Sequence, residues 1–75
     1  MNKNKIVRFQ SLIHPELNIS YTIKDGYVVS IRVKNKETNR ILIIKTSINT
    51  NVPDLALQGA VDCMAAGKAF NRGMI

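Results

Sequence analysis

The stretch that decides the fold runs from residue 18 to residue 46 and reads Asn-Ile-Ser-Tyr-Thr-Ile-Lys-Asp-Gly-Tyr-Val-Val-Ser-Ile-Arg-Val-Lys-Asn-Lys-Glu-Thr-Asn-Arg-Ile-Leu-Ile-Ile-Lys-Thr. It is rich in β-branched residues, which favour strands. Two polar turn sequences, at residues 24–26 and 35–39, divide it into three runs. Runs of this kind joined by short turns predict a three-stranded antiparallel meander over residues 18–46.

The first turn predicts the register of the first two strands. Lys24-Asp25-Gly26 suits a three-residue loop with Gly26 at the position of positive φ. This loop gives one apolar face, with the pairs Ile23–Tyr27, Tyr21–Val29 and Ile19–Ile31. A two-residue loop would place Ile19 opposite Arg32, and because a one-residue slip turns every side chain to the other face, we expect the longer loop. The opposite face is then polar and basic, with Ser20, Thr22, Lys24, Ser30, Arg32 and Lys34.

The second turn leaves the orientation of the third strand open. A five-residue loop places Ile41 and Ile43 on the apolar face, and a four-residue loop places Leu42 and Ile44 there instead. In both cases two large aliphatic residues lie on the polar face of a strand that we expect at the sheet edge. Either the N-terminal segment or another chain must therefore cover them, so we treat Ile41, Leu42, Ile43 and Ile44 as candidate interface residues.

Composition indicates one small, basic domain over residues 1–75. There are 11 Lys and Arg against 5 Asp and Glu, a formal net charge of +6, which favours a nucleic-acid or other anionic partner. The single cysteine, Cys63, excludes a disulfide within the chain and favours a reducing compartment. Because there is no long apolar run, we expect no membrane segment and a cytoplasmic location.

The N-terminal third is less regular. Residues 1–5 are predicted to form a flexible basic arm, and residues 6–13 alternate cleanly in neither phase, so the sheet has three strands, or four if this segment joins it. His14 is the only histidine, and it lacks the second His or paired Cys that a metal site requires. We therefore read His14 as a loop residue and expect no metal and no cofactor.

A helix is predicted over residues 52–70, which completes an α+β fold with one C-terminal helix packed on one face of the sheet. Asn51 suits the N-cap, Pro53 the first turn, and Asn71-Arg72-Gly73 the stop. At 100° per residue one stripe faces the sheet. Its members are Ala56, Leu57, Ala60, Met64 and Gly67, with Val61 and Cys63 at its sides and Gln58 and Asp62 opposite. We read Cys63 as a small core residue.

This order of elements resembles two related groups of DNA-binding modules. They are the ethylene-response-factor domain of plants, also found beside phage homing endonucleases, and the arm-binding domain of tyrosine recombinases. The residues that carry the resemblance are 26–34, Arg40-Ile-Leu-Ile and the alanine-rich run 55–69. The resemblance implies groove reading by the outer face of the sheet, with Arg32, Lys34 and Arg40 in the matching positions. Those families also use Trp, which this chain lacks.

Two functional hypotheses follow, and neither is an enzyme, because no nucleophile–base pair, carboxylate pair or phosphate loop can be assembled. The first is nucleic-acid binding, to DNA foremost, by the outer face of the sheet. Its candidate contacts are Arg8, Lys24, Arg32, Lys34, Lys36 and Arg40, with Lys3 and Lys5 in the arm. The alternative is a small phage-type inhibitor or adaptor that binds a host protein through an edge strand and exposed aliphatic residues.

We also expect a homodimer. The chain is short for a self-sufficient core, and its third strand is apolar on both faces. Pairing of residues 40–46 with the same strand of a second copy would satisfy the edge and bury the aliphatic residues.

Overall fold

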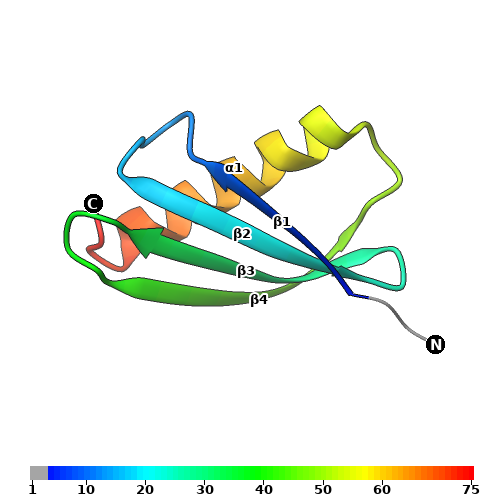
Figure 1. Cartoon of the computed structure of the whole chain (residues 1–75), viewed down its shortest axis with the longest axis horizontal. Helices are drawn as coiled ribbons and strands as arrows, with labels where there is room; N and C mark the ends of the chain where they lie inside the picture. The colour runs from blue at the N-terminus through cyan, green and yellow to red at the C-terminus, as the bar shows by residue number, and fades with distance from the viewer. Residues whose placement is uncertain (1–3) are drawn as a thin grey trace.

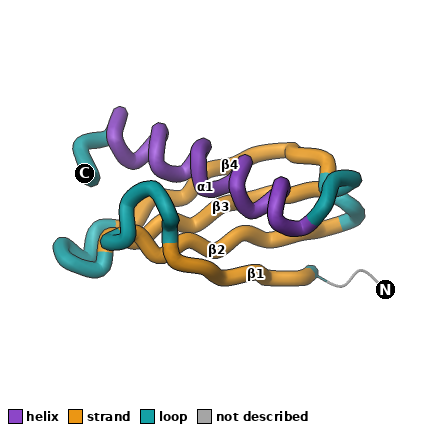
Figure 2. Tube along the Cα trace, turned by 90° about the horizontal axis from the view of Figure 1, so that it is seen from above, coloured by secondary structure: helices purple, strands orange, loops and turns teal. Residues whose placement is uncertain are grey.

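The computed structural model describes residues 4–75 and shows an α+β fold, in which four antiparallel strands precede one helix (Figure 1). The strands are β1 (Lys5–Gln10), β2 (Leu17–Lys24), β3 (Tyr27–Asn35) and β4 (Ile41–Asn49), and the helix is α1 (Asp54–Asn71). Each strand pairs with the next one in the chain. Helix α1 lies along one face of the sheet, where it contacts β2 and β3 (Figure 2).

The N-terminal segment does form a fourth strand, β1, which pairs with β2 from Lys5 opposite Ile23 to Gln10 opposite Asn18. It lies at the edge opposite β4, so the alternative in which this segment covers the aliphatic residues of the third predicted strand is wrong. Among the described residues, β1 and β4 are the two edges of the sheet. Of the predicted basic arm, residues 1–3, including Lys3, lie outside the described residues, and Lys5 begins β1.

The hairpin between β2 and β3 corrects the predicted register. Asp25 and Gly26 form a two-residue turn with φ of 53° and 82°, and Lys24 lies opposite Tyr27. Positive φ at both central positions is what a type I′ turn requires. A bulge then shifts the pairing by one residue, so that Tyr21 lies opposite Ile31. The predicted pairs were wrong because the apolar residues are aligned by a two-residue turn and a bulge, and not by a three-residue loop. Sequence alternation does not reveal a bulge.

The hairpin between β3 and β4 settles the orientation of β4. The Asn35 N–H donates to the Arg40 carbonyl at 2.9 Å, and Lys34 lies opposite Ile41, so the loop has four residues, 36–39. Ile44 is therefore in the core and Leu42 packs against it. Ile41 and Ile43 lie on the other face, where they are 49% and 52% exposed.

Of the two helix ends predicted from the sequence, only the C-terminal end is confirmed. Gly73 has a φ of 71°, and the Met74 N–H donates to the Ala69 carbonyl at 2.8 Å, which is the expected glycine stop. The predicted Asn51 cap is wrong, since the N-cap is Pro53 and no side chain caps the helix. The residue before a proline disfavours the α conformation, which excludes Val52 from the helix.

The buried face of α1 also differs from the prediction. Leu57, Val61, Ala65 and Ala69 are buried, with Asp62 and Ala66 beside them, whereas Ala56, Ala60, Cys63 and Gly67 are exposed. The stripe was misplaced because small residues occur on both sides of this helix, so the pattern of small residues does not distinguish its faces. The core contains Leu17, Ile19, Tyr21, Val28, Ile31, Val33, Ile44, Leu57, Val61, Ala65, Ala69 and Met74.

Candidate nucleic-acid interface

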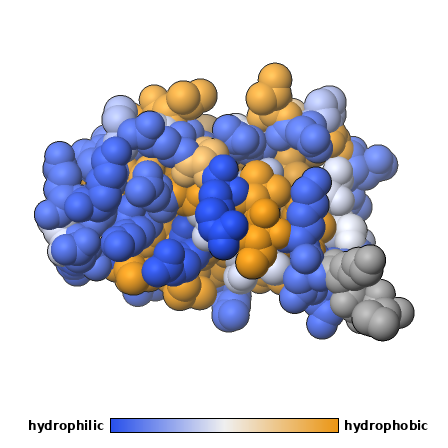
Figure 3. Space-filling model, viewed as in Figure 1, coloured by the Kyte–Doolittle hydropathy of each residue, from blue (hydrophilic) through white to orange (hydrophobic). Residues whose placement is uncertain are grey.

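The face of the sheet away from α1 is built as three cross-strand rows, because the register places the same side of each strand in line. The rows are Gln10–Asn18–Lys34–Ile41, Arg8–Ser20–Arg32–Ile43 and Ile6–Thr22–Ser30–Lys45. We call these twelve positions the outer face. Figure 3 shows mostly hydrophilic side chains, with hydrophobic side chains in several places among them.

Every charged residue of the outer face is a cation: Arg8, Arg32, Lys34 and Lys45. The five acidic residues lie elsewhere, in the turns and loops or on α1, at Glu16, Asp25, Glu37, Asp54 and Asp62. Neighbouring strands are about 5 Å apart, so Arg8 and Arg32, two strands apart in one row, are separated by about 10 Å at their backbones. The outer face therefore carries a positive potential with no acid to offset it.

Two adjoining depressions, of about 320 and 480 Å³, follow the middle of the outer face. Both are lined by Arg8, Ser20 and Arg32, and the larger extends to Lys45 on β4. Hydroxyl groups from Thr22 and Ser30 line the larger one as well. The surface is thus a shallow trough with guanidinium, ammonium and hydroxyl donors, all of which hydrogen-bond phosphate oxygens.

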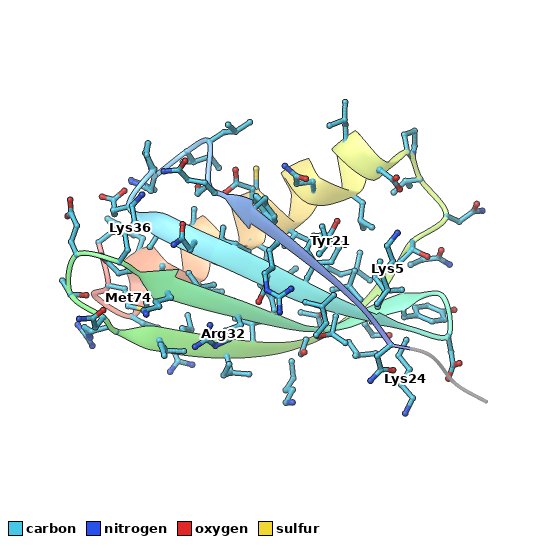
Figure 4. The ribbon with its side chains drawn as sticks, viewed as in Figure 1. Lys5, Tyr21, Lys24, Arg32, Lys36 and Met74 are labelled. Atoms are coloured by element: carbon cyan, nitrogen blue, oxygen red, sulfur yellow. The ribbon has the colours of Figure 1, made fainter. Side chains whose placement is uncertain are left out.

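The structure brings some of the predicted contacts together and separates others. Arg8, Arg32 and Lys34 share the outer face, and Arg32 projects from the sheet away from α1 (Figure 4). Lys24 and Lys36 lie at opposite ends of the sheet, where both are exposed (Figure 4). Arg40 is engaged elsewhere, since its Nη1 donates to the Gly73 carbonyl at 3.1 Å. Arg40 therefore holds the C-terminal tail and lies apart from the cations of the outer face.

The candidate interface residues divide in the same way. Ile41 and Ile43 are exposed on the outer face, whereas Ile44 is 8% exposed and belongs to the core. Leu42 is partly buried against that core. Ile44 is thus a packing residue, which corrects its assignment to an interface.

Lys45 joins the candidate contacts, although the sequence did not single it out. It lies opposite Ser30, in the row that also holds Thr22. The sequence signal for it was the length of the second loop, because that length decides which side of β4 faces outward. A four-residue loop places Lys45 beside the other outer-face cations.

The single histidine and the single cysteine lie on different elements of the described chain. His14 lies in the loop between β1 and β2, with Nδ1 3.7 Å from Oε1 of Glu16. Cys63 is exposed, which corrects its assignment to the core. Over residues 4–75 no group of three His, Cys, Asp or Glu side chains is placed to hold a metal ion.

One buried titratable group lies on the helix side of the sheet. Burial of the Tyr21 ring, with a smaller contribution from the charge of Asp54, raises the pKa of its phenol above the usual 10.0. Tyr21 lies between β2 and α1 and packs edge-on against Phe9, with the ring centres 6.0 Å apart (Figure 4). Its place in the core identifies it as a packing residue.

Within residues 4–75, no helix is both long and apolar enough to span a membrane. Comparison with protein-family models, with curated proteins and with solved structures found no match for this chain.

Proposed function

We propose that the protein binds duplex nucleic acid, DNA foremost, through the outer face of its sheet. The observation that carries the proposal is the sign of the charges there: four cations and no acid among twelve aligned positions. Phosphate contacts from Lys and Arg dominate nucleic-acid affinity, and Ser and Thr hydroxyls add positioning contacts. The resemblance of the chain to DNA-binding modules that use this side of a sheet supports the same surface.

The chemistry of the outer face favours a duplex over a single strand. Single-strand binders stack bases on exposed aromatic side chains. None of the twelve outer-face positions is aromatic, and Tyr21 is buried on the helix side, so the exposed Tyr27, opposite Lys24 at the turn end of the sheet, is a single aromatic residue beside this surface rather than a stacking platform. Sheets are known to enter a groove of duplex DNA, where cations meet phosphates and base edges.

The test is a salt titration of duplex binding by the variant Arg32→Ala/Lys34→Ala. Losing two phosphate contacts flattens the slope of log affinity against log salt by about 2. The matched control is Lys68→Ala/Arg72→Ala, which removes the same charge from the exposed end of α1 and leaves a slope closer to that of the wild type. A folded Arg32→Ala/Lys34→Ala variant with the wild-type slope would reject the outer face as the binding surface.

A further inference from the structure

Strand β4 presents an open edge. The Asn35 N–H donates to the Arg40 carbonyl at 2.9 Å, so the backbone of Arg40 points toward β3. Because these groups alternate along an antiparallel strand, the N–H and C=O groups of Ile41, Ile43 and Lys45 point the other way. No strand among the described residues pairs with that side. An unpaired edge of this length is a template for another strand.

The same edge is bordered by cations, with Lys45 on its outer side and Lys68 and Arg72 on its helix side. A depression of about 210 Å³ lies there, lined by Leu42, Ile43, Ile44, Lys45, Lys68 and Arg72. Lys68 and Arg72 come from the end of α1, and both are exposed. The ion pair found within residues 4–75 joins His14 and Glu16, so the three cations of this depression have no acidic partner in the described chain.

We propose that this edge binds an extended acidic segment of a partner protein, which adds to the sheet as a fifth strand. Successive side chains of an added strand point to opposite faces. Those on the helix side would meet Lys68 and Arg72, which selects Glu or Asp at alternate positions. Those on the outer side would lie beside Ile41 and Ile43, which selects aliphatic residues. Backbone hydrogen bonds supply affinity in this mode, and the alternating side chains supply specificity.

Charge favours this occupant over a second copy of the chain. Two-fold pairing of β4 with itself would bring the same three cations of both copies together, and apposed like charges are costly. Lysine on an edge strand is a known means of preventing pairing between identical sheets. An acidic segment turns the same cations into attractive contacts. This proposal shares Lys45 with the outer face, but it does not depend on nucleic-acid binding, because its test uses Lys68 and Arg72 and leaves Arg8, Arg32 and Lys34 unchanged.

The first experiment measures binding of a fluorescein-labelled peptide of alternating valine and glutamate, as long as β4, by fluorescence anisotropy at low salt. We expect saturable binding, and none when lysine replaces glutamate. N-methylation of alternate peptide bonds on the edge that faces β4 should abolish binding, because it removes the donors of the added strand. Equal binding of the N-methylated peptide would overturn strand addition.

The second experiment places the site. In Lys68→Glu/Arg72→Glu the peptide should bind at least about tenfold more weakly, because two attractive contacts with its glutamates become repulsive. The control Lys5→Glu/Lys24→Glu makes the same change of charge at the β1 and β2–β3 turn end of the sheet, and it should lose less affinity. Circular dichroism confirms that both variants are folded. Equal loss in the two variants would overturn the site.

Sedimentation of the free protein under the same conditions identifies the competing occupant. The proposal requires a monomer whose edge is open. A dimer that the peptide does not dissociate would show that a second copy occupies β4 and would overturn the proposal.

Discussion

Asp62 and Ser11 are 51 residues apart in the chain and form a buried hydrogen bond, in which the Ser11 hydroxyl donates to Oδ1 of Asp62 at 2.6 Å. The second carboxylate oxygen accepts the Leu12 N–H at 2.9 Å. The Ser11 hydroxyl in turn accepts the N–H groups of Ile13 and His14. The Asp62 carboxylate thus holds Ser11 and Leu12, and the Ser11 hydroxyl connects it to the next two residues of the loop.

We expect Asp62→Ala to destabilise the protein by about 2–4 kcal/mol, because it leaves a buried hydroxyl and a backbone N–H without their charged acceptor. Asp62→Asn keeps one acceptor oxygen and should cost less. Chemical denaturation measures both, and a cycle with Ser11→Ala isolates the shared hydrogen bond. Unfolding midpoints for Asp62→Ala that match the wild type would contradict this role.

Tyr21 makes a second prediction at the residue scale. The raised pKa of its phenol means that the folded state holds this proton more tightly than the unfolded state does. Its contribution to stability is therefore complete below pH 10, the usual value, and is lost as the pH rises through the folded-state pKa. In thermal melts above pH 10, Tyr21→Phe should lose less stability with rising pH than the wild type. Tyr27→Phe, at a ring that is 43% exposed, is the control and should follow the wild-type slope.

Polar residues were the part of the structure that local pattern could not predict. Asp62 was placed opposite the core, and Asn35 in an exposed loop, yet both are buried. Asn35 donates from Nδ2 to the Met74 carbonyl at 2.7 Å, and its Oδ1 accepts the Glu37 N–H. A buried polar side chain needs such partners, and here they come from distant parts of the chain. Sequence spacing contains no information about those contacts.

At the scale of elements, strand existence was predictable and register was not. β-branched runs and the turn sequence at residues 24–26 predicted β2, β3 and β4, and alternation placed Ser20, Thr22, Arg32 and Lys34 on the polar face, opposite the core. The bulge changed the partners, and at the start of β3 it also changed the faces, since Val28 is in the core where alternation predicts Tyr27 and Val29. The outer-face cations Arg32 and Lys34 were therefore found from sequence, whereas Lys45 depended on a loop length that the sequence left open.

The helix phase supplies a prediction of its own. Ala65 is fully buried and Ala60 is exposed, although the sequence predicted that Ala60 would lie against the sheet. Ala65→Leu should cost about 1–3 kcal/mol because the packed interface has no room for the added atoms. Ala60→Leu should change stability by less than about 0.5 kcal/mol, as surface substitutions usually do. Both are measured by urea denaturation, and a larger loss for Ala60→Leu would mean that α1 is rotated from its observed position.

On the scale of the whole molecule, one sheet separates two chemistries. Its helix side forms the core, and its outer side carries aligned cations with the aliphatic residues Ile41 and Ile43 at one edge. The open β4 edge joins these two sides, with Lys45 on the outer face and Lys68 and Arg72 behind it. Self-association at that edge therefore sets burial of aliphatic side chains against repulsion between like charges.

We expect this balance to make self-association stronger in high salt. Two-fold pairing of β4 centred on Ile43 would place Ile43 against its copy and Ile41 beside the other copy's Lys45, while Lys68 and Arg72 of both copies approach. Raising the ionic strength from 0.01 to 1 M shortens the screening length from about 30 Å to about 3 Å, which removes the repulsion and leaves the apolar contact. Sedimentation velocity should thus show a monomer at low salt and an increasing fraction of dimer at high salt. This salt dependence is opposite in sign to that of nucleic-acid binding.

Ile43→Lys should remain monomeric throughout, whereas Leu55→Lys, at an exposed position on α1, should dimerise as the wild type does. A wild-type mass that stays constant across this range would exclude β4 as a self-pairing edge.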